Sequence, residues 1–206
     1  MICITNDEII NRLDNLIKNP KSELEYSSPF ELLVAVMLSA QCTDKRVNEV
    51  TRVLFNKYNT PYQIAQMKVS ELESYIKSCN YYHTKAKNII DASKIIVNKF
   101  DGKVPSLHED LVSLPGVGNK TANVVQAVAF DLQALPVDTH VLRVSNRLGF
   151  VTTDSPNKCE SVLRNKFYDC DWIKLHHLLL LFGRYYCTAR SPKCDKCIMR
   201  DICIKK

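Results

Sequence analysis

Four of the nine cysteines fall within the last twenty residues and follow the spacing C-x6-C-x2-C-x5-C. A close pair with one further cysteine on each side allows a short loop to bring four thiolates around one compact metal centre. Four thiolates suit a tetrahedral zinc ion as well as a [4Fe–4S] cluster, so the spacing predicts a metal site without choosing the metal. The four residues are Cys187, Cys194, Cys197 and Cys203.

Two of the five glycines stand in a short turn-forming segment, Leu114-Pro115-Gly116-Val117-Gly118, with apolar stretches of helical spacing on both sides. The pattern predicts two helices joined by a tight glycine turn, over about residues 107–130. Such a turn exposes backbone N–H groups at a helix N-terminus, where they can bind a phosphate oxygen. Asn119 separates Gly118 from Lys120, so the segment is not a Walker phosphate-binding loop.

Lys120 is the candidate nucleophile, because it lies in the first turn of the second predicted helix. The positive end of a helix dipole disfavours an ammonium ion there and favours the neutral amine, which is the nucleophilic form of lysine. The alternative is a lysine that only binds a phosphate or faces solvent, and its position alone leaves both open.

Asp138 is the candidate charged partner, within Val137-Asp138-Thr139-His140 and directly before an apolar helical face. An aspartate at such a position is a good helix N-cap, and that structural role would explain it by itself. The two roles are compatible, since an N-cap carboxylate is held rigidly where an attacking amine or a developing positive charge can use its charge.

The elements that must position these residues are predicted to be helices. Apolar residues recur at helical spacing along most of the chain, and residues 30–40 are apolar on nearly all sides, as in a buried central helix. No segment shows the strict alternation of a half-buried strand, so we expect an all-α fold of about ten short helices.

Two further patterns predict where these helices begin and end. A serine followed three residues later by glutamate is the pattern of a capping box, and a glycine directly after a helical stretch often ends it. The predicted starts are Ser28, Ser70 and Ser106, and the predicted ends are Gly149 and Gly183.

Composition restricts the class of protein only loosely. Hydrophobic residues make up 46% and charged residues 24%, an ordinary globular balance, and the net charge of +6 favours a polyanionic partner. No secretory signal is visible, and the longest apolar run is too short to span a bilayer, so we expect a cytoplasmic protein. In a reducing compartment the other cysteines are expected to be buried thiols: Cys3, Cys42, Cys79, Cys159 and Cys170.

Taken together, these features resemble the endonuclease III family of DNA glycosylases and abasic-site lyases, over most of the chain. Leu-Pro-Gly-Val-Gly at 114–118 with Lys120 looks like the family's helix-hairpin-helix and catalytic lysine. Val-Asp-Thr-His at 137–140 looks like its catalytic aspartate segment, and Leu-Ser-Ala-Gln-Cys-Thr-Asp at 38–44 resembles its N-terminal signature. The final cysteine spacing is similar to its cluster loop, which implies a [4Fe–4S] cluster rather than zinc.

The resemblance implies a two-lobed helical bundle. Residues of about 22–133 would form a barrel-like lobe that contains the helix-hairpin-helix. Residues 1–21 would join 134–206 in a second lobe that holds the cluster loop at 187–203.

The resemblance also implies the chemistry. Oxidised pyrimidines would be removed from double-stranded DNA, and abasic sites would be nicked on the 3′ side by β-elimination through a Schiff base on Lys120, with Asp138 assisting. The expected DNA-binding residues are Gln41, Tyr81, Pro115, Gly116, Val117, Gly118 and Thr121. We expect a monomer in the cytoplasm, associated with the nucleoid and with no membrane.

The chain departs from the family pattern at two positions that would touch DNA. Asn119 stands where the family often has arginine, which removes one possible phosphate contact. Tyr81 stands where the family usually inserts leucine into the base stack, and an aromatic ring could stack there instead.

Two other functions remain open on these residues. An adenine-specific mismatch glycosylase would share the fold and cluster but would cleave without a lysine nucleophile, so Lys120 argues against it. A non-catalytic DNA-binding module with a redox-sensing cluster would explain the hairpin and the cysteines, but would make the Lys120 and Asp138 pair accidental.

Overall fold

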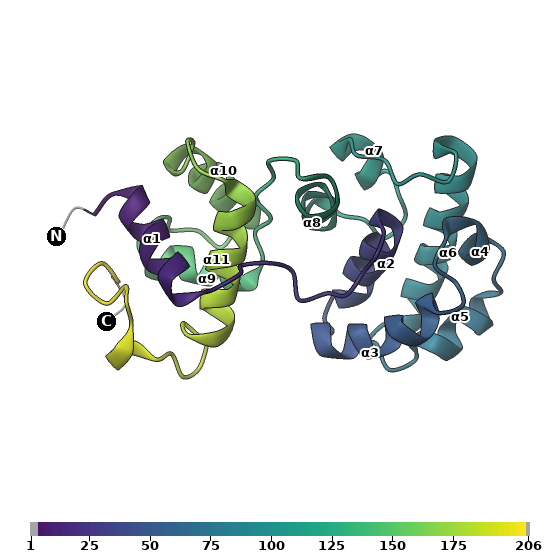
Figure 1. Ribbon diagram of the computed structural model, residues 1–206, viewed down its shortest axis with the longest axis horizontal. Helices are drawn as coiled ribbons and strands as arrows, with labels where there is room; N and C mark the ends of the chain where they lie inside the picture. The colour runs from purple at the N-terminus through teal and green to yellow at the C-terminus, as the bar shows by residue number, and fades with distance from the viewer. Residues whose placement is uncertain (1–3, 205–206) are drawn as a thin grey trace. The chain divides into compact units, whose positions relative to one another are not determined.

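The computed structural model describes residues 4–204, and within this range every regular element is a helix (Figure 1). The predicted all-α fold is therefore confirmed. No helix in residues 4–204 has both the length and the apolar character needed to cross a membrane. The helices are α1 (Asn6–Leu16), α2 (Pro29–Ser39), α3 (Asp44–Phe55), α4 (Pro61–Ala65), α5 (Val69–Ile76), α6 (Tyr82–Phe100), α7 (His108–Val112), α8 (Asn119–Phe130), α9 (Thr139–Arg147), α10 (Pro156–Lys166), α11 (Trp172–Tyr185) and the 3-10 helix η1 (Cys194–Lys196).

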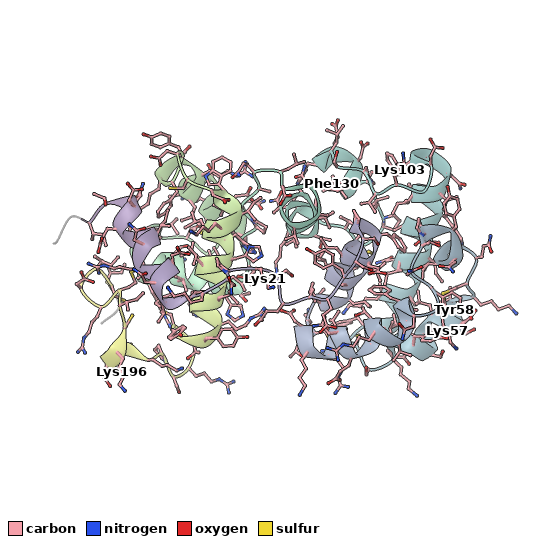
Figure 2. All side chains as sticks on the ribbon, viewed as in Figure 1. Lys21, Lys57, Tyr58, Lys103, Phe130 and Lys196 are labelled. Carbon is pink, nitrogen blue, oxygen red and sulfur yellow. The ribbon has the colours of Figure 1, made fainter. Side chains whose placement is uncertain are left out.

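The chain divides into two compact units, each with its own core. One is Ser22–Leu132, and the other combines Met1–Lys21 with Gln133–Lys206. Exposed lysines of both units, such as Lys57 and Lys196, project into solvent (Figure 2).

In the Ser22–Leu132 unit, α2 is the central element. Every residue from Phe30 to Leu38 is buried, as the apolar pattern predicts. The helix packs against α3, α6 and α8, while α4 and α5 cover α6 (Figure 1). The long α6 therefore connects the central helix to the outer ones.

In the second unit, α11 is the central element and packs against α9 and α1. Gly183 lies inside α11, so the prediction that a helix ends there is wrong. A Cβ at Gly183 would stand 3.0 Å from the Cβ of His140 and 3.0 Å from a methyl of Val144. The glycine thus permits the close approach of α9, whereas Gly149 follows the end of α9 at φ 73°, as expected.

The helix starts follow the predicted caps only in part. Ser28 caps α2 by accepting from the N–H of Glu31, as predicted. Neither Ser70 nor Ser106 caps a helix, because α5 and α7 begin at neighbouring positions, with N-caps Lys68 and Leu107 that make no side-chain cap bond. The reciprocal capping box lies instead at the start of α4, between Thr60 and Gln63.

The cysteines outside the C-terminal loop are not all buried, contrary to the expectation. Cys79 and Cys159 are buried, whereas Cys42 and Cys170 are half-buried. Cys3 lies outside the described residues.

Candidate active site and cysteine cluster

The glycine turn connects α7 to α8 through a short hydrogen-bonded loop. The N–H of Leu114 donates to Leu111 at 3.1 Å, and the N–H of Val117 donates to Leu114 at 3.1 Å. Gly116 has φ 78°, a left-handed conformation that glycine adopts without steric cost. The side chain of Val117 is buried in the core of its unit, so this residue anchors the turn.

The other residues of the turn face outward to differing degrees. Gly116 and Gly118 are exposed, while Pro115 and Thr121 are half-buried. Gly118 is the N-cap of α8 and supplies no side chain to its first-turn amides. A Cβ at Gly118 would meet nothing within 4 Å, so the space above these amides is open. An anion can approach them, as at other helix N-termini.

Lys120 is the second residue of α8 and its side chain is exposed. It makes no hydrogen bond or ion pair with any residue in the described range 4–204. No acidic residue lies in the first turn of α8, so the adjacent helix terminus places no carboxylate beside the amine. The local environment therefore leaves Nζ accessible to a substrate.

Asp138 is the N-cap of α9 and is half-buried. Its Oδ1 accepts from the backbone N–H groups of His140 and Val141, both at 2.8 Å. These two bonds fix the carboxylate at the positive end of the helix dipole. Oδ2 accepts no hydrogen bond from residues 4–204, which leaves one oxygen for a ligand. The predicted N-cap is confirmed, and it holds the charge rigidly.

Two arginines one turn apart connect α9 to the start of the cysteine loop. Arg143 donates to the carbonyls of Cys187 at 3.1 Å and Gly183 at 2.8 Å. Arg147 donates to the carbonyl of Thr188 at 2.7 Å and to the Sγ of Cys187 at 3.3 Å. The helix that Asp138 caps is thereby joined by hydrogen bonds to the loop that carries the cysteines.

The first helix of the chain supports the same loop from another side. Arg12, in α1, donates to the carbonyl of Ile198 at 3.1 Å and pairs with Asp201 at 2.8 Å. Residues of α1 and α9 thus hold one loop.

The four C-terminal cysteines come near one another without forming a single-ion site. Burial raises the pKa of the Cys197 thiol, and the nearby Cys187, Cys203 and Cys194 raise it further. Yet within residues 4–204 no three cysteine, histidine or acidic side chains are arranged to hold one metal ion. Ligands of one tetrahedral zinc would lie roughly 4 Å apart, given Zn–S bonds of about 2.3 Å. Four thiolates are the donor set of a [4Fe–4S] cluster, in which each cysteine binds a different iron.

Gln41 and Tyr81 are exposed and lie in the same unit as the glycine turn. Both have left-handed backbones, with φ 55° at Gln41 and φ 59° at Tyr81. Gln41 follows α2, and Tyr81 is the N-cap of α6. Left-handed conformations are uncommon for residues other than glycine and asparagine, and they mark positions that the surrounding structure constrains.

The sequence interpretation missed several residues that support these sites. Arg143 and Arg147 are spaced by four on a predicted helix, a pattern that could have indicated one shared face. Asn80 and Lys85, which bind the carbonyls around Gln41, carry no comparable signal.

Comparisons with known proteins agree with this geometry. Residues 34–167 match the family model described as HhH-GPD superfamily base excision DNA repair protein. Residues 187–203 match the iron-sulfur binding domain of endonuclease III, a match that begins at Cys187 and ends at Cys203.

Similar proteins cover nearly the whole chain. Endonuclease III of Bacillus subtilis is 47% identical over 195 residues, which cover 94% of this chain and 89% of that protein. Endonuclease III of Escherichia coli K12 is 43% identical over 196 residues, which cover 95% and 93%. A solved structure of a trapped endonuclease III–DNA covalent intermediate is similar at a TM-score of 0.93 and 43% identity, over 98% of this chain and 97% of that one. A thermostable thymine-DNA glycosylase, 22% identical with a TM-score of 0.81, shares the fold.

Proposed function

Because the chain belongs to the endonuclease III family, within the HhH-GPD superfamily of base excision DNA repair proteins, we propose that Lys120 is its nucleophile and Asp138 its charged partner. The chain is a base excision repair DNA glycosylase with abasic-site lyase activity, it acts on damaged double-stranded DNA, and it binds a [4Fe–4S] cluster. The resemblance found in the sequence is confirmed, and an enzyme rather than a non-catalytic binding module accounts for the site.

The observation that carries the proposal for Lys120 is its accessible amine in the first turn of α8, which pairs with no residue among 4–204. The damaged nucleotide first leaves the base stack, at a cost that is smallest for a poorly paired base. Neutral Nζ then attacks C1′ of the sugar, the bond from C1′ to the base breaks, and the base leaves with a proton. The remaining amine proton passes to O4′ as the bond from C1′ to O4′ breaks and the sugar ring opens, which leaves a Schiff base between Nζ and C1′ that solvent can protonate.

The Schiff base determines where the strand is cut. It withdraws electrons from C1′ and so acidifies the C2′ proton. Loss of that proton expels the phosphate oxygen from C3′, which leaves an unsaturated sugar on one strand end and a 5′-phosphate on the other. The reaction is a β-elimination, because the C2′ proton and the C3′ phosphate leave from adjacent carbons as the C2′–C3′ double bond forms, and this step consumes no water.

Asp138 would act through the carboxylate oxygen that the N-cap bonds leave free. That oxygen can accept a proton from the attacking amine or stabilise the positive charge that develops on the sugar. Its partners are backbone amides, so the group stays in place without needing another side chain.

The remaining residues would hold the DNA. We propose that the backbone amides of Gly116, Gly118 and Thr121 bind a backbone phosphate, with Pro115 and Val117 shaping the turn. Gln41 and Tyr81 would enter the space that the flipped nucleotide leaves. Oxidised pyrimidines are the proposed substrates, since loss of aromatic planarity weakens their stacking.

Cys187, Cys194, Cys197 and Cys203 would hold the cluster. When bound, the cluster cross-links the C-terminal loop and brings the redox chemistry of iron–sulfur centres. Cys187 in this loop contacts Arg143 and Arg147, so the order of the loop affects α9, the helix that Asp138 caps. We further propose that the enzyme acts as a monomer on nucleoid DNA in the cytoplasm, and that each of the two units is a structural domain.

Analysis of the incision products tests this function. A duplex with one oxidised pyrimidine and a 5′ label should yield a strand that ends in the unsaturated sugar, with a 5′-phosphate on the other fragment. The Lys120→Gln variant should give no such incision. A product with an intact abasic sugar and no nick would contradict the lyase step while leaving the glycosylase step in place.

A further inference from the structure

The end of α2 is held by side chains from a distant part of the chain. Nζ of Lys85 donates to the carbonyls of Leu38 at 2.8 Å and Ala40 at 2.7 Å. Nδ2 of Asn80 donates to the carbonyl of Gln41 at 2.7 Å. Carbonyls at a helix C-terminus have no intrahelical partner. Here the carbonyls of Leu38, the C-cap Ala40 and the following Gln41 are bound by side chains at the start of α6.

Both chain segments at this place adopt strained conformations. Gln41 and Tyr81 each lie in the left-handed region, at φ 55° and φ 59°. For a residue with a Cβ, this conformation costs roughly 1–2 kcal/mol, so it persists only where other contacts hold it. The hydrogen bond from Asn80 joins Gln41 to the residue directly before Tyr81.

A buried group lies beneath the two turns. Lys85 is 8% exposed, and it lies near the thiols of Cys79 and Cys42 rather than near a carboxylate. Cys79 directly precedes Asn80, Cys42 directly follows Gln41, and Cys42 lies near enough to raise the pKa of the Cys79 thiol. Residues next to both turns therefore lie near one buried group, Lys85, which stands at the C-terminus of α2, where a cation is favoured.

Tyr81 has 65% of its surface exposed. Gln41 is also exposed, so neither side chain is held by burial. Their orientation depends on the backbone, and the backbone at Gln41 depends on Asn80. An inserting side chain that is already oriented loses less entropy on binding than one that must be ordered.

We propose that Asn80 is a positioning residue that joins the Gln41 and Tyr81 turns, so that both side chains are presented to an interrupted base stack as one preformed unit. The inference rests on the proposed role of Gln41 and Tyr81 in filling the vacated space. It assigns to Asn80 no contact with the reacting atoms. Its effect is on the discrimination between DNA with a gap in the stack and intact DNA.

The experiment compares two duplexes that differ in one nucleotide. One carries a tetrahydrofuran abasic analogue, which cannot form a Schiff base, and the other is intact. The quantity measured is the Kd for the intact duplex divided by the Kd for the duplex with the abasic analogue, both at the same salt concentration. The division cancels general charge effects. Holoenzyme variants Asn80→Ala and Asn80→Asp both remove the donor, and Asn98→Ala, at an exposed position near the other end of α6, is the matched control.

Loss of one hydrogen bond to the Gln41 carbonyl should lower the ratio about three- to ten-fold in both Asn80 variants. Asn98→Ala should leave it unchanged, and the melting temperature of all three should stay close to that of the parent. A double variant, Gln41→Ala with Asn80→Ala, should show little further loss beyond Gln41→Ala. A purely structural role would instead weaken binding to both duplexes equally and would add to Gln41→Ala.

The possible failures are distinguishable. If Gln41→Ala leaves the ratio unchanged, the proposed DNA contact of Gln41 is wrong. If Gln41→Ala lowers the ratio while Asn80→Ala does not, the DNA contact stands and the positioning role of Asn80 is overturned.

Discussion

Arg147 donates from Nη1 to the Sγ of Cys187 at 3.3 Å, while its backbone carbonyl accepts from the Sγ of Cys203 at 3.3 Å. One residue of α9 therefore contacts two of the four cysteines. The N-cap of the same helix is Asp138, about two and a half turns away. Order in the cysteine loop and order at the carboxylate are thus connected through a single short helix.

The first prediction concerns Arg147 itself. Arg147→Met should lower the iron content per chain and the visible absorption of the purified protein. The variant loses the bonds to Cys187, Thr188 and Ala189, and unmade bonds of a charged donor cost about 1–3 kcal/mol. Arg190→Met, at an exposed position in the same loop, should keep both near the parental level. Full iron loading in Arg147→Met would contradict the role of Arg147 in ordering the cysteine loop.

The second prediction separates the two roles of Asp138. Asp138→Asn keeps an oxygen that can accept from His140 and Val141, so unfolding stability should change by only a few tenths of a kcal/mol. Asp138→Ala should cost about 0.5–2 kcal/mol. Incision should nevertheless fall about a hundredfold or more in both, because both lose the charge. Denaturant unfolding and single-turnover incision measure the two effects, and an active Asp138→Asn would show that the N-cap is the whole role.

The third prediction uses the two glycines of the hairpin. Gly116→Ala should destabilise the protein by about 2 kcal/mol or more, because φ is 78° and a Cβ would stand 2.8 Å from Nδ2 of Asn88. Gly118→Ala should cost at most about 1 kcal/mol, since its φ is −96° and a Cβ meets nothing within 4 Å.

Binding to intact DNA should nevertheless weaken in Gly118→Ala, because the methyl group would occupy the approach to the first-turn amides of α8. Fluorescence anisotropy on an undamaged duplex measures this effect. Unchanged affinity in a folded Gly118→Ala protein would exclude a phosphate at this position.

The fourth prediction concerns the thiol of Cys79. Burial, together with the nearby Cys42, raises its pKa from 9.0 to about 11. At pH 8 the thiolate fraction should therefore be about a hundredfold lower in the native protein than in urea. Alkylation with iodoacetamide, followed by peptide mapping, should leave Cys79 unmodified until the protein unfolds. Rapid native alkylation would contradict the buried position.

The same shift has a consequence for stability. The folded pKa lies above the unfolded one, so the folded state favours the neutral thiol. The contribution of the neutral Cys79 thiol to the free energy of unfolding is present below about pH 9 and is lost as pH rises toward 11. The unfolded chain then gains more from releasing the proton. Unfolding curves over this window should show a smaller pH dependence in Cys79→Ala than in the parent.

Features encoded by short segments could be predicted from the sequence. The glycine turn, the N-cap at Asp138 and the buried α2 each depend on residues within one or two helical turns, so residue type and spacing were sufficient. The capping boxes at Ser70 and Ser106 did not form, because α5 begins one residue before Ser70 and α7 begins two residues after Ser106, and Glu73 accepts from His83 instead. Local preference was the weaker effect at both positions.

Contacts between distant segments could not be predicted in the same way. Asn80 and Gln41 are 39 residues apart, and Arg147 and Cys187 are 40 apart. Their pairing depends on how whole helices pack, which no spacing rule reports. The left-handed backbone of Tyr81 is similarly hidden, because tyrosine has no intrinsic preference for it.

The most direct test of the central claim is borohydride trapping on DNA that contains an abasic site. Borohydride reduces the Schiff base between Nζ and C1′ to a stable amine, so iron-loaded protein should give a covalent adduct with the DNA. Digestion and mass spectrometry should locate the adduct on Lys120, and Lys120→Gln should give none. An undiminished adduct in Lys120→Gln, or no adduct with the loaded parent protein, would contradict the lysine mechanism.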